Sequence, residues 1–438
     1  MKLPAPRRGA SVAKASEIRD GVFGMAKSIL IIGTLDTKGE EIKYLKEKVS
    51  QRGHRVIILD TGILDKPYFT PDIKREEVAR TGGVNLDKVI GLNDEWKAIE
   101  VMTEGASRIS NRLFREGAVD GILAIGGSMG SSLGLSVMQG LPMGLPKLLV
   151  NASGLSIIRP ELAGNDITIM CTISDLWGMN RITKGVLDKA SGAISGMVEN
   201  YSRELRVSLK PMIGVTTVGT AGLRYAPLLK STLERKGYEV VVFVAALAST
   251  ESLKNLIEQG EINGLVDVAL LEFANCVCNP SACGKGIDRI KVAGDMGIPL
   301  VVSPGAVDFF IWPGLPNNIP SKYESRPVHI HNSLVSLIKT TLEEKIQIAQ
   351  NVAQDLNRTK GDTVMIIPSR GFSEYDKPDG IFYDPDGRIA FIDTLRSCLK
   401  PRIKSINLDV HINDPQFAIT AGELMDAITP GKRDLKKN

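Results

Sequence analysis

Residues 28–39 read SILIIGTLDTKG, an apolar run that ends in glycine and leads into a charged, helix-like stretch at 39–52. A second apolar run, RVIIL, follows at 55–59. Unbroken apolar runs are typical of parallel strands that are buried on both faces of a sheet. A strand, a helix and a second strand in this order therefore predict a β-α-β unit, from which parallel sheets are built.

Beyond this unit, the chain keeps alternating between helical and strand patterns. A helix is predicted at 95–116, and further strands are predicted at 121–125, 145–151 and 166–171. The second half repeats the order, with strands predicted at 213–219, 237–243, 262–271 and 297–306. A long helix at 334–356 and strands at 364–368 and 403–409 are predicted to follow.

This repetition predicts an α/β fold with two Rossmann-like doubly wound domains, each with a mainly parallel sheet. The expected divisions are a flexible N-terminal extension at 1–26, a nucleotide-binding domain at 27–205 and a C-terminal domain at 206–438.

The charge balance argues against some classes of partner. The chain has 54 basic and 50 acidic residues, a net charge of +4, so it lacks the extended positive field of nucleic-acid-binding proteins. No apolar run reaches the length of a membrane helix, and the first residues lack the apolar segment of a signal peptide. We therefore expect a cytoplasmic protein that binds neither nucleic acid nor membranes, and its five cysteines are expected to be reduced.

In an open parallel sheet, ligands bind outside the carboxyl ends of the strands, so the loops after the strands are the candidate sites. Loop 33–39 (GTLDTKG) and loop 126–132 (GGSMGSS) both lead from a strand into a helix. Small residues and helix N-terminal N–H groups suit a phosphate, although turn formation and helix capping would also explain them. Neither loop matches the P-loop or the dinucleotide fingerprint.

The predicted ligand is ATP, with a Mg²⁺ ion as an optional companion held through Ser128 or Ser131. Asp60 follows the second strand, where an acidic side chain can hold a ribose hydroxyl. The full set of candidate cofactor-binding residues is Gly33, Thr34, Asp36, Thr37, Lys38, Asp60, Gly126, Gly127, Ser128, Gly130, Ser131, Ser153, Gly154, Asp175 and Asn180.

Several strings resemble one protein family, among them IIGTLDTKGEEIKYLKE at 31–47, GGSMGSSL at 126–133, ISDLWGMNRITKGVLDKASGAISGM at 173–197 and SPGAVDFF at 303–310. The chain is similar to the ATP-binding domain of the plant tomato-mosaic-virus resistance protein and its uncharacterised bacterial and archaeal relatives. The resemblance covers the chain after Lys27. It implies two Rossmann-like domains, ATP binding by the N-terminal domain and a homodimer, and it implies no particular reaction.

The second domain departs from the pattern of this family. Where the family carries a loop of the type H-A-T-G-x-G-G-x-A-M-E, residues 244–251 read VAALASTE. Glu272 is retained, but the residues that follow it, FANCVCNPSACG at 273–284, replace a glycine pair. The expectation of ATP binding therefore rests on the N-terminal loops.

Two clusters in the second domain could carry chemistry of their own. Cys276, Cys278 and Cys283 are weak candidate metal ligands, and their spacing is not a strong metal signature, so we predict that no metal is bound. The candidate catalytic residues are Asp308, His329 and His331, with hydrogen-bonded structural histidines as the alternative.

The leading functional prediction is a nucleotide-binding protein of unassigned reaction, with a regulatory role as one option. The first alternative is an enzyme that acts on a small anionic metabolite in an interdomain cleft with ATP as co-substrate. The second is a small-molecule sensor like the periplasmic binding proteins. The small-residue stretch 185–197 suits close helix packing in the expected homodimer, and any protein partner is left open.

Overall fold

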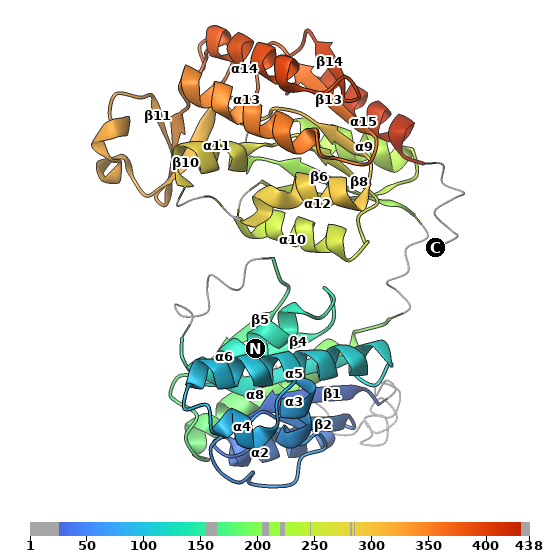
Figure 1. The fold of residues 1–438 in the computed structure, drawn as a ribbon, viewed down its shortest axis with the longest axis vertical. Helices are drawn as coiled ribbons and strands as arrows, with labels where there is room; N and C mark the ends of the chain where they lie inside the picture. Colours follow the sequence, from blue (N-terminus) through green and yellow to red (C-terminus); the bar gives the residue numbers. More distant parts are fainter. Residues whose placement is uncertain are drawn as a thin grey trace, which may run out of the picture. The chain divides into compact units, whose positions relative to one another are not determined.

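The computed structural model describes residues 26–154, 164–203, 210–219, 224–245, 247–280, 283 and 285–430, so the predicted extension at 1–26 lies outside it except for Ala26. The chain divides into two compact units, unit 1 at Met1–Arg206 and unit 2 at Val207–Asn438. Each unit contains a parallel sheet between layers of helices (Figure 1), as predicted for two Rossmann-like domains. None of the described helices is both long and apolar enough to cross a bilayer.

The sheet of unit 1 contains β1 (Ser28–Gly33), β2 (Arg55–Asp60), β3 (Gly121–Gly126), β4 (Lys147–Asn151) and β5 (Thr168–Cys171). All four neighbouring pairs are parallel, in the order β2-β1-β3-β4-β5. The chain thus leaves β1 toward one edge and crosses back over it to β3. The topological switch point therefore lies between β1 and β3.

Helices cover both faces of this sheet, because side chains alternate between the faces along each strand. Ile29 and Ile31 pack into one apolar cluster with α2 (Gly39–Ser50) and α8 (Arg181–Glu199). Leu30 and Ile32 pack into the opposite cluster. The helices of that second face are α3 (Arg75–Thr81), α4 (Leu86–Ile90), α5 (Glu95–Arg115) and α6 (Ser128–Gln139).

Unit 2 repeats this arrangement with one more strand. Its sheet contains β6 (Met212–Thr217), β7 (Glu239–Val244), β8 (Gly264–Asp267), β9 (Leu300–Val302), β13 (Thr363–Pro368) and β14 (Lys404–Leu408). The order is β14-β13-β9-β8-β6-β7, again all parallel, so its switch point lies between β6 and β8.

The helices of unit 2 also form two layers. One face is covered by α9 (Tyr225–Arg235) and α15 (Pro415–Ile428). The other is covered by α10 (Leu247–Glu258), α11 (Leu271–Cys278), α12 (Arg289–Met296), α13 (Leu342–Leu356) and α14 (Pro385–Cys398). Short 3₁₀ turns occur at η5 (Lys285–Asp288), η6 (Pro316–Asn318) and η7 (Ser321–Tyr323).

In the sequence, the segment between β9 and α13 forms a three-stranded antiparallel sheet that the sequence patterns did not predict. It consists of β10 (Phe309–Pro313), β11 (Val328–Asn332) and β12 (Val335–Lys339), in the order β10-β12-β11. The predicted helix at 334–356 is therefore wrong in its first part. The helix begins only after Thr341, whose side chain forms a capping box with Glu344, and the preceding segment pairs with two strands instead.

The expectation that all cysteines are reduced is also wrong. Cys276 and Cys283 form a disulfide, because the chain turns back after α11 and brings their Cα atoms to 4.5 Å, within the range that a disulfide can bridge. Cys171 and Cys398 are free and exposed, whereas Cys278 is free and buried.

The contact between α3 and α5 depends on Gly105, where a Cβ atom would overlap the carbonyl oxygen of Val78. We expect Gly105→Ala to lower the free energy of unfolding by about 1–3 kcal/mol, as overpacking typically does. Gly196→Ala on α8 is the matched control, because a Cβ there meets no atom within 4 Å. The control should gain about 0.5–1 kcal/mol from helix propensity. Denaturant unfolding of both variants tests this, and equal stabilities would contradict the described packing.

Candidate functional site

Two helix N-termini lie next to each other at the switch point of unit 1, because α2 follows β1, α6 follows β3, and the two strands pair directly. Neither helix has a side chain that caps its first N–H groups: the N-cap residues are Lys38 and Gly127, and neither forms a side-chain cap. Uncapped N–H groups and the positive end of the helix dipole favour an anion. The first turn of α6 contains no acidic residue that would oppose an anion, whereas the first turn of α2 contains Glu40 and Glu41, so α6 is the more favourable of the two helix ends.

Gly127 leaves open space in front of α6. A Cβ built on Gly127 would meet no atom within 4 Å, whereas one on the preceding Gly126 would lie 2.7 Å from the Cα of Gly130. Gly126 is therefore required by the packing of the turn, and Gly127 is not. Ser128, which begins α6, is exposed at the same place.

The β1–α2 loop is held by its own hydrogen bonds. The amide of Lys38 donates to the carbonyl of Thr34 over 2.8 Å, and the hydroxyls of Thr34 and Thr37 lie 2.6 Å apart. Thr37 is exposed and Thr34 is half-buried, so both hydroxyls remain near solvent. The predicted residues of this loop thus lie together at the switch point.

Lys38 links this loop to the connection between β5 and α8. Its side chain is buried, and its ammonium donates to the carbonyl of Leu176 and lies 5.3 Å from the centre of the Trp177 ring. A second link is formed by Glu41, whose Oε1 accepts from the amide of Gly178 over 2.7 Å. The connection after β5 is therefore fixed beside the β1–α2 loop.

Two of the predicted aspartates have structural partners. Asp60 is fully buried, and its Oδ1 accepts from the amides of Leu35 and Gly62, each at 2.9 Å. Its carboxylate is therefore closed off from a ribose in this conformation, contrary to the prediction. The Oδ2 of Asp36 accepts from the amide of Leu64 over 2.8 Å. Both side chains hold the loops that follow β1 and β2.

The predicted residues after β3 and β4 also form a connected group. Ser131 is fully buried, and its hydroxyl donates to the carbonyl of Gly126 over 3.1 Å or to the Oδ1 of Asn151 over 2.9 Å. Ser153 donates to the same Oδ1 through its amide and its hydroxyl. Gly154 accepts from the Nδ2 of Asn151 over 3.1 Å. Of the two predicted serine ligands, only Ser128 thus faces solvent.

Asn180 and Asp175 lie in the connection after β5. Asn180 caps α8 by accepting from the amides of Ile182 and Thr183, at 2.9 and 3.0 Å. Asp175 is exposed and accepts from the amide of Leu176 over 2.7 Å. Asn180 therefore supports the helix rather than the open side of the loop.

Sequence reasoning singled out this connection but missed its apolar residues. Trp177 and Ile173 are each 83% exposed, and the Trp177 ring lies against the ammonium of Lys38. The signal was the tryptophan in the loop SDLWGMN at 174–180. An exposed indole beside a phosphate-type loop is a surface on which a flat ring can stack.

The candidate catalytic residues of unit 2 do not form one group. Asp308 is fully buried and accepts from the hydroxyl of Ser373 over 2.6 Å, and burial together with the charge of Asp376 raises its pKa to about 7. His329 and His331 lie on β11, and burial, with the charge of His331, lowers the pKa of His329. Asp308 is enclosed in the interior, whereas His331 is exposed and His329 is half-buried, so the geometry gives no support to joint catalysis by the three residues.

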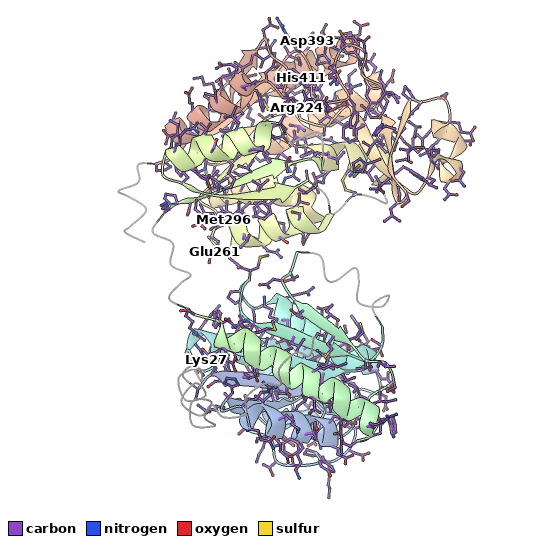
Figure 2. All side chains as sticks on the ribbon, turned by 180° about the vertical axis from the view of Figure 1, so that it is seen from behind. Lys27, Arg224, Glu261, Met296, Asp393 and His411 are labelled. Atoms are coloured by element: carbon purple, nitrogen blue, oxygen red, sulfur yellow. A yellow bond between two sulfur atoms is a disulfide. The ribbon has the colours of Figure 1, made fainter. Side chains whose placement is uncertain are left out.

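Other polar groups of unit 2 are part of its packing. The Nε2 atom of His411, a residue labelled in Figure 2, lies 2.9 Å from the carbonyl oxygen of Ser373. Among the candidate metal ligands, Cys276 and Cys283 are joined to each other, and burial raises the pKa of the Cys278 thiol well above its usual range. In the described parts of the chain, no group of three or more His, Cys, Asp or Glu residues could hold a metal ion.

The fold defines a two-domain Rossmann-like α/β protein with glycine-containing loops after β1 and β3 of its first unit. The chain belongs to the uncharacterised protein family UPF0261: the model of the family's N-terminal domain matches residues 27–203, and that of its C-terminal domain matches residues 210–429. This confirms the family predicted from the sequence strings.

Relatives match over nearly the whole chain. A UPF0261 protein of Clostridium tetani is 36% identical over 398 residues, which are 90% of this chain and 97% of that protein. A UPF0261 protein of Brucella suis is 33% identical over 91% of this chain and 94% of its own length. The tomato ToMV resistance protein Tm-1(GCR237) is 28% identical over 93% of this chain, and the match spans 56% of the tomato protein.

A solved Streptomyces glycosyltransferase, SsfS6 complexed with thymidine diphosphate, aligns at 14% identity with a TM-score of 0.19. The alignment covers 63% of this chain and 81% of that one, and a likeness this weak carries no argument.

The geometry of Asp60 leads to a prediction about pH. Burial raises the pKa of Asp60 above 3.8, its ordinary value, although two amides donate to it. The folded state therefore favours the protonated form of Asp60. The stability that this preference provides is fully present below about pH 4 and is lost as the pH rises through the pKa of Asp60 in the folded state. Asparagine keeps the accepting Oδ1, so we expect Asp60→Asn to gain stability relative to wild type between about pH 4 and about pH 8.

Asp60→Ala is the contrasting variant, because it leaves the amides of Leu35 and Gly62 without an acceptor. We expect the free energy of unfolding of Asp60→Ala to be lower than that of wild type by about 1–3 kcal/mol for each unpaired donor, at every pH. Urea unfolding at both pH values measures all three proteins. If the free energy of unfolding of wild type instead rose relative to that of Asp60→Asn as the pH increases, the buried position of the carboxylate would be contradicted.

Proposed function

We propose that unit 1 is a nucleotide-binding domain whose expected ligand is ATP, with its phosphates at the N-termini of α2 and α6. The observation that carries the proposal is the pair of uncapped helix N-termini on adjacent strands, with open space in front of Gly127. Helix N-termini of this kind favour phosphate groups through their N–H groups and their dipoles.

The surrounding side chains support this assignment. The exposed hydroxyls of Thr37 and Ser128 are available to a phosphate or to a Mg²⁺ ion that accompanies it. Lys38 brings a positive charge to the β1–α2 loop. Trp177, beside Lys38, offers its exposed ring for stacking with a base.

The corresponding edge of unit 2 is chemically different. There, α11 follows β8 and carries the buried Glu272 in its first turn. Glu272 and Asp267 both pair with the fully buried Arg289, at 3.1 and 2.8 Å. Both carboxylates of this edge are therefore paired with a buried cation, which favours unit 1 as the nucleotide site.

Calorimetric titration with Mg-ATP tests the proposal through Gly127→Leu. The new side chain has room within the protein but would occupy the space in front of α6, so we expect affinity to fall at least about tenfold, or 1.4 kcal/mol. We expect Lys38→Ala to weaken the binding free energy of Mg-ATP by roughly 1.5–3 kcal/mol, the range for hydrogen bonds to charged groups. The control, Ser50→Leu, adds an exposed leucine at the opposite end of α2 and should bind as wild type does.

Thermal unfolding establishes that each variant is folded before its affinity is compared. Equal affinity in wild type, Gly127→Leu and Lys38→Ala would place any bound nucleotide elsewhere. Loss of binding in Ser50→Leu as well would mean that the assay reports stability rather than the site.

The proposal extends to a homodimer formed through the outer face of α8. Gly185 is exposed, and Gly192 and Gly196 are half-buried, so this face allows close approach of another chain. We expect light scattering at micromolar concentration to give twice the chain mass of 47.4 kDa. Gly196→Arg, which has open space at its Cβ, should fold and give a single chain mass. A wild-type protein that scatters as one chain would rule out this assembly.

A further inference from the structure

Unit 2 contains a cavity of about 240 Å³ that belongs to none of the sites described above. One wall comes from the edge of the parallel sheet, including Val244 at the end of β7 and Leu271 at the start of α11. The other wall comes from the antiparallel sheet, including Phe309 of β10 and Val335 of β12. The inserted sheet therefore closes a space over the carboxyl edge of the main sheet.

The position of this cavity is one where α/β proteins bind ligands. Val218 and Gly219 directly follow β6, Leu271 lies beyond β8, and all three line the cavity. The gap between β6 and β8 is the switch point of the second sheet. Crevices at such points are the general ligand sites of open parallel sheets.

Most of the cavity wall is apolar. Val244 is 45% exposed although it ends a strand, and Val335 is half-buried at the opposite wall. Leu271 and Phe309 belong to one apolar cluster behind them. The volume is below the roughly 300–1,000 Å³ of pockets for drug-sized molecules, so a small apolar body fits and a strongly hydrated one is disfavoured.

The polar side chains at the cavity wall are those of His331, Asn332 and Tyr375. The pairing of β11 with β12 shifts register between Ile330 and Asn332, so His331 is the extra residue of a β-bulge, a device that re-aims side chains. His331 lines the cavity, and His329 stacks 4.7 Å from the ring of Tyr375, which lines it too. Two imidazoles at one end of an apolar cavity disfavour each other's positive charge.

An acidic group at this end would relieve that repulsion. Burial and the charge of His331 both lower the pKa of His329 and so disfavour its charged form. A carboxylate can accept hydrogen bonds from imidazole N–H groups and favours their charged form, whereas a cation would add to the repulsion. The ligand that fits both ends is therefore amphiphilic and anionic.

We propose that unit 2 binds a small organic acid with an apolar or aromatic body. The body lies against Val244, Leu271 and Val335, and the carboxylate lies at His331 with His329 behind it. This site is independent of the nucleotide site, because all of its residues are in unit 2.

Ligand-observed NMR titration of the full chain tests the site with hexanoate, benzoate, 3-phenylpropionate and indole-3-acetate. We expect saturable binding of at least one of these acids, and binding about tenfold weaker for its alcohol counterpart, which lacks the charge. Absence of saturable binding by all four acids would overturn the proposal. Equal binding of acid and alcohol would overturn the role of the histidines.

Three variants locate the site. His331→Gln, an exposed position, should weaken the acid about tenfold and leave the alcohol unchanged. Val335→Trp should fill the cavity and abolish binding of both, whereas Val335→Ala is the control that keeps the space and should bind both. Acid binding that survives Val335→Trp would place the ligand elsewhere. All three should bind Mg-ATP as wild type does, so failure here is distinguishable from failure of the nucleotide proposal.

Discussion

The arrangement of both units depends on one constraint, the return of the chain across its first strand. In unit 1 the chain passes from β1 to β2 and then back to β3, which pairs with β1 on its other side. This crossing leaves the loops after β1 and β3 next to each other with no helix between them at that edge. The N-termini of α2 and α6 are adjacent for this reason, although 89 residues separate Gly39 from Ser128.

Buried polar contacts then fix the loops at this edge before any ligand is bound. Asp60 accepts hydrogen bonds from the amides of Leu35 and Gly62. Lys38 and Glu41 form hydrogen bonds with the connection after β5. The hydrogen bonds of each contact offset part of the desolvation cost of burying these groups. A loop that is held in this way loses little conformational entropy on binding, which favours affinity.

The two units use the same edge of the same fold differently. In unit 1 the helix ends are uncapped, whereas in unit 2 the buried Arg289 pairs with both Asp267 and Glu272. A buried ion cluster of this kind is stable only when all its members are present, since removal of one leaves an unpaired charge. The inserted antiparallel sheet then adds an apolar wall, so the second unit presents a closed cavity where the first presents free N–H groups.

The sequence by itself determined the strands of the two parallel sheets and their order along the chain, because apolar runs such as 28–33 and 121–126 have to be buried on both faces. It also placed Gly127 and Lys38 in the loops that follow β3 and β1. It could not predict that Asp60 and Ser131 point inward, since the acceptor and donor atoms that satisfy them come from distant loops. Nor could it predict β12, because the residues 335–339 become a strand only through pairing with β10 and β11. Local pattern therefore decides which segments are strands and helices, and tertiary contacts decide which polar side chains are left for a ligand.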